Sequence, residues 1–112
     1  MIIRTAVLEG RVAPANKADF DHHMRTTVVQ ALGRYPGIVK AVLREVAEID
    51  TDAPPVYMAF DLYFHTLEDM HAALASPVRQ AVRAELAQVM PRFEGRVYHV
   101  VFDETARSLP PA

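Results

Sequence analysis

The chain of 112 residues has room for one domain, and its 51% hydrophobic and 23% charged residues are typical of a globular protein. A formal net charge of −2 without any basic run argues against nucleic acid or an anionic membrane as a partner. The absence of cysteine excludes disulfides and thiolate chemistry and, with no signal-peptide pattern or apolar run of bilayer length, favours a cytoplasmic location.

The first half of the chain predicts a strand, a helix and a second strand. Residues 2–9 alternate and are rich in branched side chains, as strands are. Asn16, with Asp19 three residues later, predicts the start of a helix, and apolar residues recur at helical spacing from Phe20 to Leu32. Gly33 and the Tyr-Pro-Gly turn that follows end this helix, and residues 38–49 predict the second strand.

The second half predicts the same pattern in a different order. Residues 56–65 form the clearest strand, and Thr66 is placed to cap a helix that is interrupted at Ser76–Pro77, with Ser76 capping the second part, and runs on to Met90. Residues 96–103 predict the fourth strand. Residues 1–104 are therefore expected to form a single domain, and the Pro-rich residues 105–112 a loose tail.

The order strand, helix, strand, strand, helix, strand is the split βαβ pattern of ferredoxin-like α+β folds. It predicts a four-stranded antiparallel sheet with both helices on one face. Alternation along the third strand places Val56, Met58, Phe60, Leu62 and Phe64 toward the helices.

The other face of this sheet is too apolar to be left in water. Two helices cover one face only, while Tyr57, Ala59 and Tyr63 lie on the other in place of the usual polar residues. We therefore predict a homodimer that packs sheet against sheet, a dimeric α+β barrel. The alternative is a monomer with a hydrophobic open face.

Two segments carry a resemblance to a known family. Residues 61–77, DLYFHTLEDMHAALASP, resemble the apolar strand and capped helix of EthD-like dimeric α+β-barrel proteins. Residues 20–38 are similar to that family's first helix and its Pro-Gly turn, although Thr-Thr-Val-Val at residues 26–29 stands where members often carry His-x-Pro-Leu. The resemblance implies a superfamily of cofactor-free monooxygenases, isomerases, haem-handling enzymes and ligand-binding domains, so the fold alone does not give the function.

The expected site lies on the sheet face away from the helices. Tyr57, Asp61, Tyr63 and His65 on the third strand, with His99 on the fourth, would form an aromatic wall with converging polar groups. His65 or His99 would transfer a proton, Asp61 would orient the imidazole and Tyr63 would stabilise an oxyanion. The alternative is that these residues make polar contacts inside the dimer interface.

Two further residues are candidates for ligand binding. Arg44 on the second strand would bind a substrate carboxylate, or would protect a sheet edge. His23 would reach the mouth of the pocket, although adjacent His22 and His23 point in different directions and cannot share a metal. No metal-ligand spacing and no phosphate-binding loop is found, so we expect neither a metal nor a cofactor.

These observations favour two functions. The first is an enzyme that acts on a small aromatic or polyketide-like molecule in a degradation or secondary-metabolite pathway, by cofactor-free oxygenation or isomerisation. The second is a non-catalytic protein that binds a small organic ligand or serves as an accessory protein.

Overall fold

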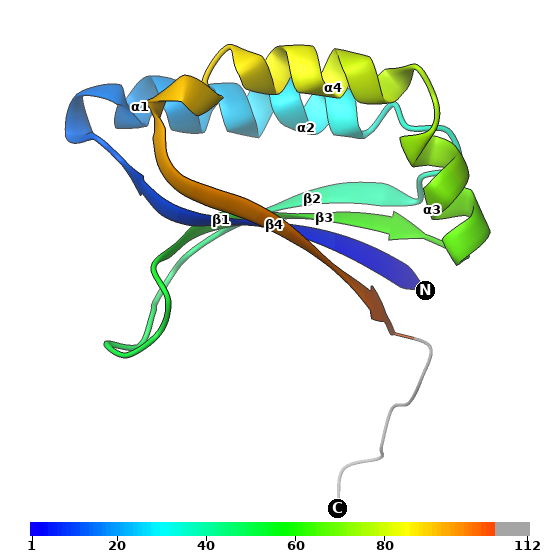
Figure 1. Cartoon of the computed structure of the whole chain (residues 1–112), viewed down its shortest axis with the longest axis horizontal. Helices are drawn as coiled ribbons and strands as arrows, with labels where there is room; N and C mark the ends of the chain where they lie inside the picture. Colours follow the sequence, from blue (N-terminus) through cyan, green and yellow to red (C-terminus); the bar gives the residue numbers. More distant parts are fainter. Residues whose placement is uncertain (105–112) are drawn as a thin grey trace, which may run out of the picture.

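The computed structural model describes residues 1–104, and the predicted tail lies outside them. The strands are β1 (Ile2–Val12), β2 (Lys40–Glu45), β3 (Val56–Phe64) and β4 (Phe93–Asp103). They form one antiparallel sheet in the order β2-β3-β1-β4. A helical layer covers one face of this sheet, which is the predicted ferredoxin-like α+β arrangement (Figure 1).

The first helical segment is longer than expected and starts earlier. It runs through α1 (Pro14–His23), the π-helical turn η1 (Met24–Val28) and α2 (Val29–Leu32). Pro14 occupies the first helical position, where its missing N–H costs nothing. The prediction that Asn16 caps the helix is therefore wrong, because Asn16 lies inside the first turn and its amide bonds to the Ala13 carbonyl.

The second helical segment is divided into α3 (Leu67–Leu74) and α4 (Val78–Ala87), followed by the short η2 (Met90–Arg92). Thr66 caps α3 as predicted, because its hydroxyl accepts a 3.1 Å hydrogen bond from the Asp69 amide. Ser76 does not cap α4; its hydroxyl donates to the Ala73 carbonyl and so closes the end of α3. The chain still bends at Ser76–Pro77, as the sequence predicted.

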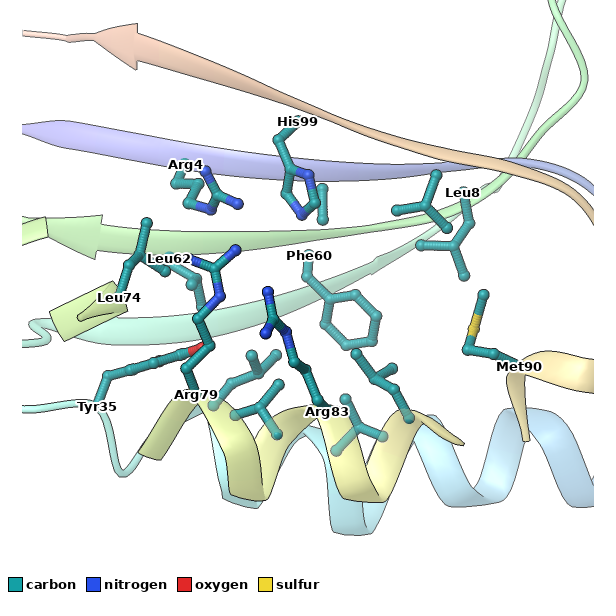
Figure 2. A pocket seen from close by; sticks show the side chains of 16 residues that line it. Arg4, Leu8, Tyr35, Phe60, Leu62, Leu74, Arg79, Arg83, Met90 and His99 are labelled. Atoms are coloured by element: carbon teal, nitrogen blue, oxygen red, sulfur yellow. The ribbon is translucent and has the colours of Figure 1, made fainter. Parts of the chain in front are cut away.

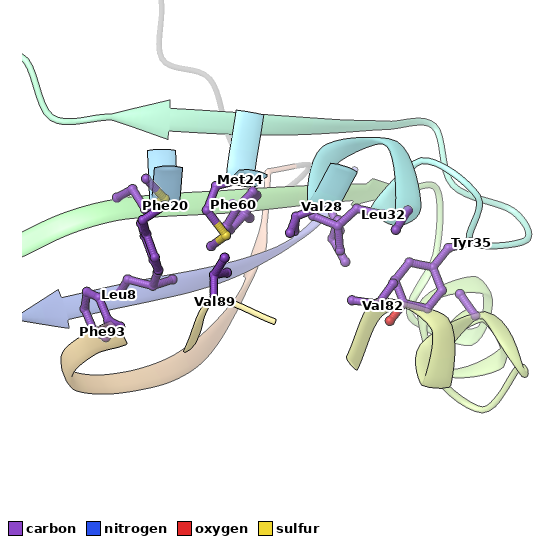
Figure 3. Packing of buried hydrophobic residues seen from close by; sticks show 14 of the residues in the cluster. Leu8, Phe20, Met24, Val28, Leu32, Tyr35, Phe60, Val82, Val89 and Phe93 are labelled. Atoms are coloured by element: carbon purple, nitrogen blue, oxygen red, sulfur yellow. The ribbon is translucent and has the colours of Figure 1, made fainter. Parts of the chain in front are cut away.

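The core lies between the helical layer and the sheet. Phe20, Met24 and Val28 are fully buried on the first helical segment, one helical turn apart. They pack against β3 residues such as Phe60, which is 4% exposed (Figure 3). The alternation predicted for β3 is confirmed from Met58 to Phe64, where every second side chain is buried against the helices.

One close approach ties β1 to β4. Gly10 and Gly95 lie opposite each other in the register, with φ of 150° and 156°. A Cβ added at Gly10 would lie 2.1 Å from the Glu94 carbonyl oxygen, and one added at Gly95 would lie 2.1 Å from the Glu9 carbonyl oxygen. Both backbones therefore need glycine here, and this contact holds β4 along the edge of β1.

We predict that Gly10→Ala destabilises the protein by more than about 2 kcal/mol, because the added methyl collides with backbone that cannot move alone. Gly33→Ala is the matched control, since its Cβ would meet nothing closer than 3.5 Å and Gly33 has helical φ. That variant should be neutral or slightly stabilising. Urea unfolding measures both, and equal stabilities for the two variants would contradict the account.

Candidate functional site

A cavity of about 310 Å³ lies between the sheet and the helical layer. This volume is within the range of small-molecule sites. Most of its wall is apolar and comes from the first helical segment, β3 and α4, including Val28, Leu32, Phe60, Leu62, Val82 and Leu86. Val28 ends the π-helical turn, a feature that is frequent at functional sites.

The polar part of the wall is positively charged. Arg4 from β1 and His99 from β4 reach in from the sheet, and Arg79 and Arg83 reach in from α4. Figure 2 shows the two arginines of α4 extending toward the side of the sheet that carries Arg4 and His99. Arg83 and His99 are exposed at the mouth, whereas Arg4 and Arg79 are partly buried.

The local structure explains this placement. Arg79 and Arg83 are four residues apart and so lie on one side of α4, the side that also carries Val82 and Leu86 into the cavity. On the sheet, Arg4 shares the helix-facing side of β1 with Ala6 and Leu8. His99 is opposite Ala6 in the register and therefore faces the same way.

The charges change the acid–base behaviour of His99. Desolvation in the cavity, followed by the positive charges of Arg4 and Arg79, lowers the pKa of His99 below the usual 6.5. The neutral imidazole is thus favoured at physiological pH. A neutral imidazole beside an apolar cavity is suited to accept a proton from a bound molecule.

Tyr35 forms another part of this wall. The residue is 5% exposed, and Figure 2 shows its hydroxyl beside Arg79. Burial raises the pKa of Tyr35, against the opposing effect of Arg79, Arg4 and Arg83. The phenol therefore stays protonated and is available as a hydrogen-bond donor at the cavity wall.

Of the predicted cluster, Asp61 and Tyr63 lie on the opposite, open face of the sheet, where they meet Arg44, the separate ligand-binding candidate of β2. Asp61 is 3% exposed, accepts a 2.7 Å hydrogen bond from the Thr5 hydroxyl and forms an ion pair with Arg44. Arg44 also donates to the Tyr63 hydroxyl at 3.3 Å. These groups satisfy one another, and none of them lines the large cavity.

The expectation that His99 shares a face with Asp61 and Tyr63 is wrong. Asp61 is opposite Thr5 of β1, and His99 is opposite Ala6, the next residue along that strand. Neighbouring residues of a strand point to opposite faces, so the sheet separates His99 from Asp61. His65 lies in the bend after β3, where it is exposed, and does not line the cavity.

Tyr57 also leaves the open face, for a different reason. Leu8 pairs with Met58 but Glu9 pairs with Val56, so Tyr57 is the extra residue of a β-bulge. The bulge turns its side chain toward α1, where its ring packs edge-on to Phe20 with centroids 5.7 Å apart.

The Tyr57 hydroxyl completes a small polar cluster with α1. It donates to Asp21, which is 7% exposed, and accepts from Lys17 at 2.9 Å. Desolvation and the hydrogen bond to Asp21 raise the pKa of Tyr57. The arrangement joins the bulge of β3 to α1, so the structure places Tyr57 in packing and outside the large cavity.

His23 does not reach the mouth of the cavity. Its Nε2 lies 2.8 Å from the Glu85 carbonyl oxygen, and because a carbonyl only accepts, Nε2 carries the hydrogen. The imidazole thus connects α1 to α4. This contact explains its partial burial without a ligand.

The sequence interpretation missed four residues of the cavity wall: Tyr35, Arg4, Arg79 and Arg83. The spacing of Arg79 and Arg83 contained a usable signal, because both flank Val82 on the apolar side of α4. Arg4 had a weaker signal, because it is the single charged residue in the apolar first part of the first predicted strand. Nothing local marked Tyr35 as more than part of a turn.

Within residues 1–104, no three His, Cys, Asp or Glu side chains gather closely enough to hold a metal ion. None of the helices described is long and apolar enough to cross a membrane. The side chains that bring polar groups to the cavity wall are those of arginine, histidine and tyrosine, around a space that is otherwise apolar.

At the level of sequence, no protein-family model matches the chain, and no curated protein matches it. Solved structures do resemble it. An EthD family protein from Bacillus halodurans superposes with a TM-score of 0.74 at 16% identity, covering 93% of this chain and 98% of the other.

Two other structures are similar over nearly the whole chain. SnoaB from Streptomyces nogalater, a cofactor-independent oxygenase crystallised as a mutant, gives a TM-score of 0.61 at 18% identity, with 98% and 97% of the two chains covered. A dabb family protein with a ferredoxin-like fold from Mesorhizobium loti gives 0.66 at 13% identity, with 91% and 95% covered. The chain thus has the ferredoxin-like α+β fold of the EthD-like and antibiotic-biosynthesis-monooxygenase-like proteins.

Proposed function

We propose that this chain binds a small, flat, aromatic or polyketide-like molecule in the cavity between helices and sheet and assists its cofactor-free oxygenation or isomerisation. One observation carries the proposal: His99, with a lowered pKa, lies at the mouth of an apolar cavity beside arginines. That arrangement removes a proton from carbon and stabilises the resulting enolate. The likeness to SnoaB, a cofactor-independent oxygenase, is consistent with such chemistry.

The proposed reaction begins when His99 takes a proton from a carbon that is acidified by a neighbouring carbonyl. The arginines and the Tyr35 hydroxyl then stabilise the negative oxygen of the enolate. In an isomerisation the proton returns to another carbon. In an oxygenation of a CH₂ group, dioxygen supplies one oxygen atom to the new carbonyl and leaves the other as water, so no external reductant is consumed.

A second function is favoured by one feature of His99. Among the described residues that line the cavity there is no carboxylate to orient its imidazole, as a base in a catalytic pair usually requires. The cavity would then hold a pathway intermediate or effector without converting it. A ligand that raises the melting temperature and is recovered unchanged would favour this binding role.

We further propose that two copies pair through the open face of the sheet, in the cytoplasm. Phe102 is 52% exposed and Val100 is 39% exposed, and both lie on this face opposite Ile3 and Thr5. The network of Asp61, Arg44 and Tyr63 would be enclosed in that interface, the alternative role considered for it above. Hydrophobic area of this kind is usually covered.

Replacing the proposed base tests the catalytic role. His99→Gln should lower kcat at least about 100-fold, because the amide cannot accept the proton. Anthrones and unsaturated lactones are suitable first substrates, followed by oxygen consumption and by absorbance. His65→Gln is the matched control, since His65 is exposed outside the cavity, and it should retain full activity. Equal rates in both variants would remove His99 from the mechanism.

The electrostatic account predicts a pKa for His99 that can be measured without a substrate. An NMR titration should find the pKa of His99 below 6.5, and Arg79→Gln should raise this pKa because it removes a neighbouring positive charge. Turnover should accordingly rise with pH through this pKa and level off by neutral pH. Arg34→Gln, an exposed change outside the cavity wall, should leave the titration unchanged. A pKa at or above 6.5 would contradict the account.

The dimer is tested by a charge on the open face. The native protein should be a dimer by light scattering at micromolar concentration, and Phe102→Glu should shift it to monomer, because burying an unpaired carboxylate is costly. Leu67→Glu places the same charge at a similarly exposed residue on α3, at 49% exposure, and should leave the dimer intact. A native monomer would overturn this part of the proposal.

A further inference from the structure

The polar groups of the cavity wall are unbalanced in charge. Arginines at positions 4, 79 and 83 line it together with His99, while its wall contains no aspartate or glutamate. In the part of the chain that the structure describes, no carboxylate forms a salt bridge with any of these three arginines. Three positive charges therefore converge on one apolar space in a chain whose net charge is −2.

Of the six arginines of residues 1–104 that lie outside the cavity wall, four pair with a carboxylate although they are exposed: Arg11, Arg25, Arg44 and Arg96. The other two, Arg34 and Arg92, form no salt bridge and are exposed to water. Exposed guanidinium groups need such partners least, because water solvates them. A partly buried guanidinium group needs a carboxylate partner more than an exposed one does. Arg4 and Arg79 are partly buried, and the cavity wall offers them no carboxylate.

The unpaired state has an electrostatic cost within the cavity. Burial and the charge of Arg79 both lower the pKa of Arg4. Arginine nonetheless stays protonated in proteins, so the repulsion is present whenever the cavity holds no negative charge. A bound anion would offset this repulsion and accept hydrogen bonds from the guanidinium groups.

The positive groups occupy one part of the cavity and leave the rest apolar. Arg4, His99, Arg79 and Arg83 face one another across it, while Leu8 and Met90 extend the wall beyond them (Figure 2). A ligand that satisfies both parts has a negative group at one end and an apolar body of limited size, because the space is about 310 Å³.

We infer that the ligand of this cavity is a small, largely apolar organic acid, whose carboxylate is held between Arg4 and the arginines at positions 79 and 83 while its apolar body lies against Phe60, Val82 and Leu86. The planar guanidinium group matches a carboxylate in a bidentate manner, which makes arginine the fitting residue type. The inference rests on the proposed function only in taking this cavity as the binding site. Beyond the proposed function, it specifies that the ligand carries a negative charge.

The test compares acids with neutral molecules of the same shape. Calorimetric titration of the full chain with 2-naphthoate and 2-naphthylmethanol, and with 4-phenylbutanoate and 4-phenylbutanol, separates the charge from the apolar body. In at least one pair the acid should bind at least about tenfold tighter than the alcohol, and this preference should shrink as salt is raised.

Substitutions locate the preference. Arg79→Gln combined with Arg83→Gln should remove most of the preference for the acid and leave binding of the alcohol within about twofold. Arg34→Gln makes one equivalent change of charge outside the cavity wall and should alter neither affinity. The double lysine variant, Arg79→Lys with Arg83→Lys, should keep part of the preference, which guards against a variant that simply unfolds.

The outcomes distinguish this inference from the proposed function. Equal affinity for acid and alcohol, or a preference unchanged by loss of both arginines, would overturn the inference and leave the cavity and His99 as proposed. Failure of all four compounds to bind at millimolar concentration would also overturn it. A preference that depends on the arginines, found together with unchanged turnover in His99→Gln, would support the inference and overturn the catalytic proposal.

Discussion

The register of β1 between β3 and β4 is the constraint on which the rest of this molecule depends. β1 is a central strand, and its residues from Ile2 to Glu9 have a partner on both β3 and β4. Because strand side chains alternate, this register decides which residues meet the helices and which meet the open face. A shift of β1 by one residue would place Ile3 and Thr5 toward the helices in place of Arg4 and Ala6, and the cavity would lose the arginine that the sheet contributes.

The periodicity of apolar residues predicted most of the fold, because it can be recognised from residues that are close together in the sequence. The split βαβ order and the buried set of β3 follow from patterns of two and of about three and a half residues. Alternation does not decide which of two mixed sets faces the helices. On β4, Val97, His99 and Val101 differ little in hydrophobicity from Tyr98, Val100 and Phe102, and the register with β1 decides between them.

The site was predictable only in part, for the same physical reason. Asp61 and Tyr63 share the open face, as alternation along one strand predicts. Their contact with Arg44 on the adjacent strand β2 was not predicted. Tyr57 was misplaced because one inserted residue reverses the alternation, and a bulge leaves little trace in composition. Arg4 and Arg79 are distant in sequence, so their meeting depends on how α4 crosses the sheet, which no local pattern contains.

The charge of the cavity links binding to chemistry. Arginines that would hold an anion also lower the pKa of His99, so the group that accepts a proton and the groups that stabilise the resulting anion are set by one arrangement. A bound carboxylate would neutralise part of that charge and raise the pKa of His99. The same arginines would then bind less strongly to an enolate. A carboxylate in the cavity therefore either belongs to the substrate itself and holds it in place, or belongs to a separate acid that competes with a neutral substrate. The net charge of the whole chain does not indicate the charge of the site, because a protein with a formal net charge of −2 has a cavity whose wall is positively charged.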